Sequence, residues 1–170
     1  MKLKDYTKEK HKIAEQMPFN LKLIEGRLSK EAYVAYLKQM SKVYQSIEDR
    51  LSDKLPMELL RADNFLKDIV ELTGNEQPNQ ELNESTDAYV KYLNSITTED
   101  LWAHVYLNYL ALLYGGQIIK KYCQGSGAIY DFQNKEQLID YIRVKQTKAS
   151  PEEVNSGFDY IIKIYHELDK

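Results

Sequence analysis

The chain has 170 residues, enough for one domain with a single core, and we expect that domain to span 1–170. Its 23 basic and 26 acidic side chains give a formal charge of -3, which is not the footprint of a general nucleic-acid-binding protein. Cys123 is the only cysteine, so the sequence excludes an internal disulfide and a cysteine-rich metal site.

The N-terminal segment MKLKDYTKEKHK is charged throughout and has no apolar core of a secretory signal. The most apolar stretch, 101–119, contains His104, Asn108, Gln117 and two glycines, so it falls short of a membrane span. We therefore expect a cytoplasmic protein with no membrane contact, and we expect it to be a monomer.

Apolar residues recur at helical spacing along almost the whole chain, without sustained period-two alternation, and this pattern predicts an all-α fold. In chain order, the expected helices are a first stripe from Leu3 that ends near Pro18, a short helix over 19–24, a long helix after Ser29 that extends to Leu51, a helix over about 57–72 that Gly74 closes, a helix over 86–96, a helix that contains 103–121, a helix from Asn134, and a last helix that ends near Leu168.

Helix-start signals support several of these boundaries. Ser29 is a good N-cap, and Thr97 followed three residues later by Asp100 resembles a capping box. Asn134 with Gln137 predicts another start, and the run from Ser150, with proline and two glutamates after it, predicts the last. The segments 75–85 and 125–127 are expected to be loops.

His11 lies on the flank of the first apolar stripe, where it shares a helix edge with Lys4, Thr7 and, less closely, Glu15. For an arbitrary sequence such an edge is usually a solvated helix shoulder. The alternative is a histidine that ligates a metal or a cofactor, with a lysine nearby for an anionic group.

The other two histidines do not suggest ligands. His104 lies among apolar residues, as a satisfied core or rim histidine does, and His166 is expected to be exposed near the C-terminus.

Gly115 and Gly116 interrupt an apolar helical run, where each glycine costs about 1 kcal/mol relative to alanine. Such a pair lets a helix bend and lets its backbone approach a flat ligand, such as a planar macrocycle, because no Cβ intervenes. Close packing against another helix explains the pair equally well.

Common signatures of other sites are missing from the sequence. No Glu-x-x-His pair of a helical di-iron site occurs, and there is no Gly-x-Ser-x-Gly, Walker loop or dinucleotide fingerprint. The 14 tyrosines suit amphipathic positions in a helical core or a pocket lining.

Two segments carry a resemblance to a known family. LKDYTKEKHKIAE resembles the first helix of biliverdin-forming heme oxygenases, in which a lysine precedes the proximal heme ligand by seven residues; these are Lys4 and His11 here, with Thr7 and Glu15 also fitting. LWAHVYLNYLALLYGGQIIKK is similar to the family's distal signature, Ala-His-x-Tyr-x-Arg-Tyr-Leu-Gly-Asp-Leu-Ser-Gly-Gly-Gln. The matching residues are Ala103, His104, Tyr106, Tyr109, Leu110, Leu113, Gly115, Gly116 and Gln117.

Weaker matches extend the resemblance over nearly the whole chain. Tyr44 falls at the family's distal tyrosine, Arg143 at an arginine that binds a heme propionate, and Phe158 at a pocket aromatic. The resemblance implies a compact all-α heme oxygenase bundle, with heme held between the helix of His11 and the kinked helix of Gly115 and Gly116.

The implied activity is that of an oxidoreductase that cleaves heme, with O2 and electrons, to biliverdin, iron and carbon monoxide. His11 would be the metal ligand, Lys4 and Arg143 would pair with the propionates, and polar distal residues would organise water that donates a proton. The implied partner is an external electron donor, a ferredoxin or a flavin reductase.

The distal segment departs from the family pattern. Leu112 replaces the distal aspartate, Ala111 a glycine, Asn108 the arginine and Tyr114 the serine, while Ile139 stands where a second propionate lysine is expected. One hypothesis is that Tyr44, Tyr106, Asn108 and Tyr114 rebuild the water network. The others are a heme-binding, heme-sensing or storage protein without efficient turnover, and a helical interaction protein without cofactor.

Overall fold

The computed structural model describes residues 2–78, 81–146 and 149–170, and within these ranges the chain is helical, with no β-strand. This confirms the predicted all-α class. The helices are α1 (Leu3–Tyr6), α2 (Lys8–Glu15), α3 (Pro18–Ile24), α4 (Lys30–Leu51), the 3-10 turn η1 (Met57–Leu59), α5 (Ala62–Thr73), α6 (Glu84–Ser95), α7 (Thr98–Tyr114), α8 (Gly116–Ile119), the 3-10 turn η2 (Ala128–Tyr130), α9 (Lys135–Gln146) and α10 (Pro151–Leu168).

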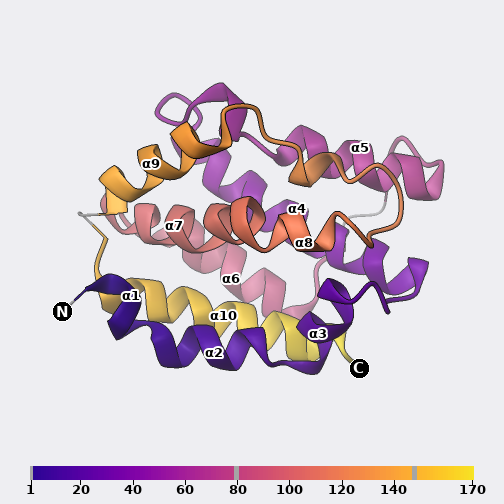
Figure 1. The fold of residues 1–170 in the computed structure, drawn as a ribbon, viewed down its shortest axis with the longest axis horizontal. Coiled ribbons are helices and arrows are strands. Elements are labelled where there is room, and N and C mark those ends of the chain that lie inside the picture. The colour runs from indigo at the N-terminus through magenta and orange to yellow at the C-terminus, as the bar shows by residue number, and fades with distance from the viewer. Residues whose placement is uncertain (1, 79–80, 147–148) are drawn as a thin grey trace.

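Two long helices, α4 and α7, form the middle of the bundle (Figure 1). α5 and α6 pack against α4, α9 and α10 pack against α7, and α2 lies on α10. The apolar faces that the sequence pattern predicts supply this shared core, and Leu37, Ile47, Leu101 and Leu113 are fully buried in it. The N-terminal helices thus lie against the C-terminal helix, in the lower part of Figure 1.

Three predicted helix starts are confirmed by their caps. The hydroxyl of Ser29 accepts a hydrogen bond from the amide of Ala32 at 3.0 Å, and that of Thr97 accepts one from Asp100 at 3.1 Å. Ser150 caps α10 in the same way, through the amide of Glu153. Each bond satisfies an amide that has no partner within its own helix, which fixes where that helix begins.

The first stripe is not one helix, because the chain turns at Thr7 between α1 and α2. The Thr7 side chain is buried, and its hydroxyl donates to the carbonyl of Leu3 at 3.0 Å. Back-bonding of this kind by threonine bends helices. The apolar spacing before and after the turn is preserved, so periodicity alone did not reveal it.

The helix expected over about 57–72 begins later, since η1 ends at Leu59 and α5 starts at Ala62. The cause is Glu48 on α4, whose carboxylate accepts from the backbone amides of Arg61 at 2.7 Å and Ala62 at 3.1 Å. It also accepts from the Tyr109 hydroxyl at 2.7 Å. A side chain from another helix therefore caps α5, and a local sequence pattern does not contain that information.

Arg61 joins this cap to the loop before α9. Its guanidinium donates to the carbonyls of Glu58 at 2.9 Å and Asp131 at 2.7 Å. Asp68 on α5 accepts from the amides of Ala128 and Ile129 in η2 at 2.8 and 3.0 Å. Buried charges are retained only where such bonds replace water, so these contacts fix α4, α5 and η2 together.

Tyrosines fill much of the core. Tyr36, Tyr44, Tyr89, Tyr109 and Tyr130 are almost completely buried. Burial raises the pKa of each of these phenols above its ordinary value, because the ionised form would be desolvated. All five are therefore neutral hydrogen-bonding groups at physiological pH.

Among the helices that the structure describes, none combines the length and the apolar character needed to cross a bilayer.

Candidate functional site

His11 lies on the exposed side of α2, and its ring makes an edge-on contact with Phe158 of α10, with ring centroids 5.8 Å apart. Within the described residues no hydrogen bond involves its ring nitrogens. An imidazole that is oriented by an aromatic neighbour and keeps both nitrogens available can ligate a metal. The structure therefore brings two of the predicted site residues, from opposite ends of the chain, into contact.

The residues predicted to share a helix edge with His11 differ in exposure. Lys4 and Glu15 are exposed, whereas Thr7 is buried and its hydroxyl is already bonded to Leu3. Lys4 is therefore available to an anion, and Thr7 instead shapes the turn that precedes α2.

α7 ends at Tyr114 and α8 begins at Gly116, and Gly115 between them keeps a helical backbone conformation. Ala111, Tyr114 and Ile118 are exposed, with Tyr114 and Ile118 at 47% and 51%, and Gly115 is partly exposed. Residues at this spacing share one helix face. α7 and α8 thus present an apolar strip, defined by Ala111, Tyr114, Gly115 and Ile118, that is not covered by protein.

The two glycines serve different purposes. A Cβ on Gly116 would lie 2.7 Å from Cδ1 of Tyr130, so close packing explains this glycine. A Cβ on Gly115 would meet, among the described atoms within 4 Å, only the carbonyl oxygen of Ala111 at 3.2 Å. Gly116 supports the packing interpretation, whereas Gly115 leaves bare backbone on the exposed strip, as a flat ligand requires.

This difference predicts that two matched variants differ in how much stability they lose. We expect Gly116→Ala to lower the free energy of unfolding by about 1–3 kcal/mol, because the buried Tyr130 ring must move. Gly115→Ala should change it by less than about 1 kcal/mol, since its backbone is helical and its surroundings are open. Urea unfolding of both proteins, followed by circular dichroism, measures the two values; equal losses would contradict the assignment.

A chain of hydrogen bonds runs through the interior from α10 to α7. His104 is completely buried, and its Nε2 lies 2.8 Å from Oε1 of Glu153 while its Nδ1 lies 2.7 Å from the Tyr89 hydroxyl. Asn108 donates from Nδ2 to that hydroxyl at 3.1 Å and to the carbonyl of His104 at 2.9 Å. Tyr44 donates to the carbonyl of Asn108 at 2.6 Å.

The protonation state of His104 follows from its surroundings. Burial lowers the pKa of His104, and the Glu153 carboxylate offsets only part of that effect, so the ring is neutral at pH 7. Nε2–H then donates to Glu153, and Nδ1 accepts from Tyr89. The prediction of a satisfied core histidine is confirmed. The side chain of Glu153 is 15% exposed, so it connects this series of hydrogen bonds to the surface.

The predicted distal residues divide into two groups. Tyr44 and Asn108 belong to the buried chain, and Leu112, 3% exposed, lies in the core one helical turn after Asn108. Tyr114 lies on the exposed side and accepts a hydrogen bond from Nη2 of Arg143 at 2.7 Å. Tyr106, half-buried, is near this pair: burial raises its pKa, and the Arg143 charge partly offsets the rise.

Sequence reasoning missed three residues of this region: Tyr89, Glu153 and Gly157. A Cβ on Gly157 would lie 2.6 Å from Leu107 and 3.0 Å from Nδ1 of His104, so this glycine lets α10 approach α7 closely enough for Glu153 to reach His104. A glycine inside the last helical pattern was the available signal.

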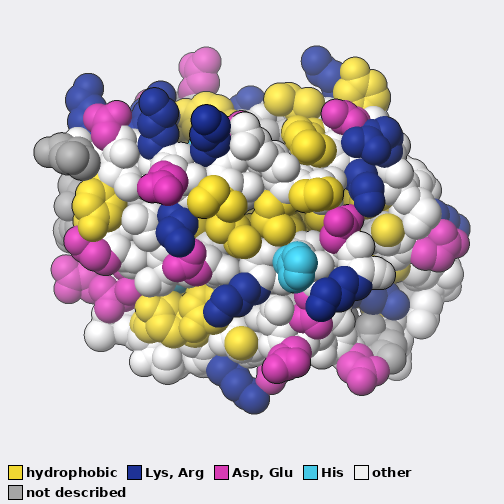
Figure 2. Space-filling view, turned by 90° about the horizontal axis from the view of Figure 1, so that it is seen from below, with side chains coloured by type: hydrophobic (Ala, Val, Ile, Leu, Met, Phe, Trp, Pro, Cys, Tyr) yellow, Lys and Arg dark blue, Asp and Glu magenta, His cyan; other side chains and the backbone are white. Residues whose placement is uncertain are grey.

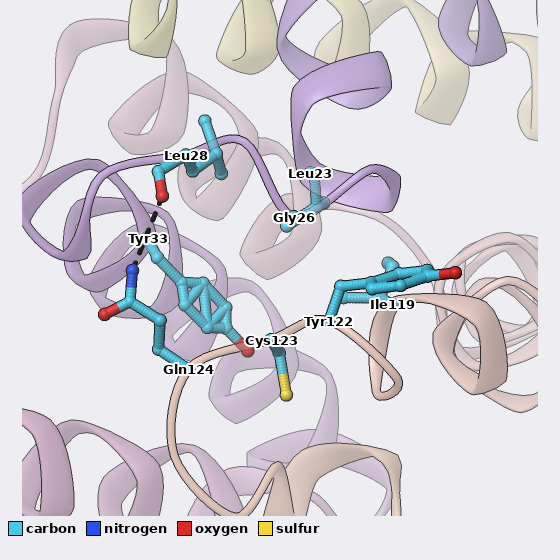
Figure 3. A pocket seen from close by; sticks show the side chains of 8 residues that line it. All are labelled: Leu23, Gly26, Leu28, Tyr33, Ile119, Tyr122, Cys123 and Gln124. Carbon is cyan, nitrogen blue, oxygen red and sulfur yellow. Dashed lines mark hydrogen bonds between the residues drawn. The ribbon is translucent and has the colours of Figure 1, made fainter.

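The end of α3 and the segment after α8 are joined around a small crevice (Figure 3). A Cβ on Gly26 would lie 2.6 Å from Cβ of Tyr122, and Gln124 donates to the carbonyl of Leu28 at 3.4 Å. The crevice has a volume of about 20 Å³, enough for one water molecule and far too small for a macrocycle. The contacts around it join α3 and the turn after it to α8 and the segment that follows.

The face on the side of α1 to α3 combines apolar and basic groups. Figure 2 shows an exposed histidine beside a band of hydrophobic side chains, with Lys and Arg side chains nearby. Within the described part of the chain, no cluster of three His, Cys, Asp or Glu side chains could hold a bare metal ion. A lone exposed imidazole instead suits a metal that arrives inside an organic ligand.

Comparison with known proteins identifies the family. A family model described as heme oxygenase matches residues 1–161. Heme oxygenase 2 of Oryctolagus cuniculus is 29% identical over 203 residues, covering 99% of this chain and 65% of that protein. Heme oxygenase of Rhodella violacea is 27% identical over 202 residues, covering 99% and 86%. The chain spans just under two thirds of the length of the mammalian proteins, 65% for Oryctolagus cuniculus and 64% for Macaca fascicularis.

Solved structures agree. Heme oxygenase from Leptospira interrogans has a TM-score of 0.81 and 28% identity, covering 97% of each chain. Heme oxygenase-1 from Synechocystis, in complex with heme, has a TM-score of 0.86 and 23% identity, covering 98% of this chain and 90% of that one, and shows the same fold. The predicted heme oxygenase-like fold is thereby confirmed. With a family model that matches nearly its whole length, the chain belongs to the heme oxygenase family.

Proposed function

We propose that the chain is a heme oxygenase that cleaves heme, with O2 and external electrons, to biliverdin, iron and carbon monoxide. The observation that carries the proposal is the available imidazole of His11 together with the apolar strip at Gly115. A planar macrocycle needs a ligand to its iron on one side and a surface without side chains on the other. The family assignment makes heme the macrocycle to test.

The residues present fit such a substrate. His11 would hold the iron, with the Phe158 ring limiting its rotation, and the macrocycle would lie against Ala111 and Gly115. Lys4 and Arg143, both exposed cations, would pair with the propionates. Thr7 would set the turn before α2, and Glu15 would lie one helical turn beyond His11 at the edge of the site.

Bound heme supplies the iron at which oxygen is activated. The protein must then order water and deliver protons, although Leu112 is apolar where the family pattern has an aspartate. We assign this task to the buried series of hydrogen bonds. In it, Asn108 donates its amide hydrogens to the Tyr89 hydroxyl and the His104 carbonyl, and Tyr44 fixes the Asn108 backbone. Oδ1 of Asn108 would accept from the ordered water, while Tyr89 would exchange its hydroxyl proton with His104, and Glu153 connects these hydrogen bonds to solvent.

Tyr106 and Tyr114 have a separate place in this scheme. Because Tyr114 is bonded to Arg143 and Tyr106 lies within range of its charge, both belong to the propionate side of the site rather than to the buried chain. We propose that the protein acts as a monomer in the cytoplasm and receives electrons from a ferredoxin or a flavin reductase.

The test is to add hemin and follow the Soret band, then to supply O2 with reduced ferredoxin or a flavin reductase and follow the bilin absorption. A Soret shift followed by a bilin product supports the proposal. A hemin complex that never yields a bilin would instead favour a heme carrier or sensor. The buried, apolar Leu112 is the observation that favours this alternative. Absence of any Soret shift would leave an interaction protein without cofactor.

A further inference from the structure

Tyr89 and His104 form a buried pair in which a phenol faces a base. The Tyr89 hydroxyl lies 2.7 Å from Nδ1 of His104, and both side chains are completely buried. Because Nε2–H of His104 donates to Glu153, Nδ1 is the acceptor and the phenol is the donor. An amide hydrogen of Asn108 also donates to the phenol oxygen at 3.1 Å. The phenol therefore has one neighbour that can take its proton and another that can stabilise its oxygen.

This geometry is what a tyrosine needs to lose one electron reversibly. Oxidation makes a phenol strongly acidic, so its proton must leave with the electron, and a buried phenol cannot give it to water. At Tyr89 the proton moves to Nδ1 of His104. The imidazolium is paired at once with the Glu153 carboxylate, 2.8 Å from Nε2, and a neutral phenoxyl radical remains on Tyr89. One returning electron, with the return of that proton, restores the pair.

A second tyrosine connects this pair to the surface. The partly exposed ring of Tyr160 on α10 stacks on Tyr89, with ring centroids 4.9 Å apart and an interplanar angle of 6°. An electron can therefore pass from a reductant in solvent through Tyr160 to Tyr89. Among the described residues, no group accepts a hydrogen bond from the Tyr160 hydroxyl. The radical is consequently held at Tyr89, which has a base for its proton.

Two other tyrosines lie beside carboxylates but differ from Tyr89. Tyr109 donates to Glu48 at 2.7 Å, and that carboxylate also accepts from two backbone amides at the start of α5. Tyr92 donates to Glu153 at 2.5 Å. A proton moved to either carboxylate would cancel the charge that holds its other hydrogen-bond donors, whereas a proton moved to the imidazole creates an ion pair in place. These contacts favour Tyr89 as the site of the radical.

We propose that Tyr89, His104 and Tyr160 form a redox site that gives one electron to oxygen-centred radicals and recovers it from a thiol at the surface. The oxidant takes its proton from solvent, and the thiol releases its proton to solvent and becomes a thiyl radical, two of which pair to a disulfide. The site goes beyond the proposed function, since it needs no heme. It also suits that function, because Asn108 lies three residues before Ala111 of the apolar strip, where O2 would react.

The test uses hemin-free protein, with a photogenerated ruthenium(III) polypyridyl complex as oxidant and persulfate as the final electron acceptor. Electron paramagnetic resonance of samples frozen after the flash should show a persistent tyrosyl radical, and Tyr89→Phe should shorten its lifetime at least about tenfold. Tyr92→Phe is the matched control, because Tyr92 contacts the same Tyr160 ring but donates to a carboxylate. An unchanged lifetime in Tyr89→Phe, or its loss in Tyr92→Phe, would overturn the proposal.

Two more variants test the base and the surface tyrosine. His104→Gln can still accept from Tyr89 and donate to Glu153 but has no basic nitrogen, so it should slow radical formation at least about 100-fold, as transient absorption measures. Tyr160→Phe should slow the decay of the radical on addition of glutathione about tenfold, because the stacked relay is lost. A change of less than about threefold in either variant would contradict its assigned role.

A measurement on the wild-type protein does not depend on whether a variant folds. Electron–nuclear double resonance should detect exchangeable protons hydrogen-bonded to the radical oxygen, from Nδ1 of His104 and Nδ2 of Asn108. A radical without such protons, or no persistent radical at all, would disprove the redox site and leave the proposed function standing. Failure of the wild-type protein to bind hemin would disprove the proposed function and leave the redox site standing.

Discussion

Replacing His11 by alanine is expected to change the Soret band and spin state of the hemin complex and to lower the bilin yield by at least about 100-fold. Removing a residue that only hydrogen-bonds to a metal ligand already lowers metal affinity or activity about 10–100-fold, and this variant removes the ligand itself. The fold should be retained, because the ring is exposed and its main contact is the edge of Phe158. Absorption and electron paramagnetic resonance spectra, with bilin assays, measure the change.

Two controls make this result specific. His166→Ala removes the other exposed histidine and should leave the spectrum as in the wild-type protein. Free imidazole added to His11→Ala should restore part of the wild-type spectrum, since the space beside Phe158 would be open. If His11→Ala gave the wild-type spectrum without added imidazole, the proposed ligand would be wrong.

Replacing Glu48 by alanine is expected to lower the free energy of unfolding by about 3–5 kcal/mol, a large part of the stability of a typical domain. The variant leaves the amides of Arg61 and Ala62 and the hydroxyl of Tyr109 without their acceptor, and it removes a buried negative charge near Arg61. Chemical denaturation followed by circular dichroism, at a pH where the wild-type protein unfolds reversibly, measures the loss.

Two further variants test the mechanism of this loss. Glu48→Gln keeps one carbonyl acceptor and should be destabilised less than Glu48→Ala, although its amide hydrogens would oppose a backbone amide. Glu76→Ala, which removes an exposed carboxylate in a loop, should change the stability by less than about 0.5 kcal/mol. If Glu48→Ala cost no more than Glu76→Ala, the cap on α5 would be without energetic importance.

Local rules were sufficient for most helices of the fold. The spacing of apolar residues predicted the helical class, and the caps at Ser29, Thr97 and Ser150 predicted three starts because each acts within its own turn. The start of α5 was predicted too early because it depends on another part of the molecule: Glu48 on α4, fourteen residues before Ala62, decides where α5 begins.

The candidate site shows the same division. His11 and the glycine pair could be found from the sequence, since the residue types themselves indicate the chemistry. The difference between Gly115 and Gly116 could not, because it depends on the ring of Tyr130 from a later loop. Likewise, Glu153 and Tyr89 become recognisable as partners of His104 only when Gly157 has brought α10 against α7.

The tyrosine-rich core makes this fold sensitive to alkali. Phenols exposed by unfolding release their protons near pH 10, whereas the folded core holds them to higher pH because burial raises their pKa. The unfolded chain therefore binds fewer protons than the native one, and stability falls as the pH rises above about 10. A family member that keeps fewer buried phenols would lack this sensitivity to base.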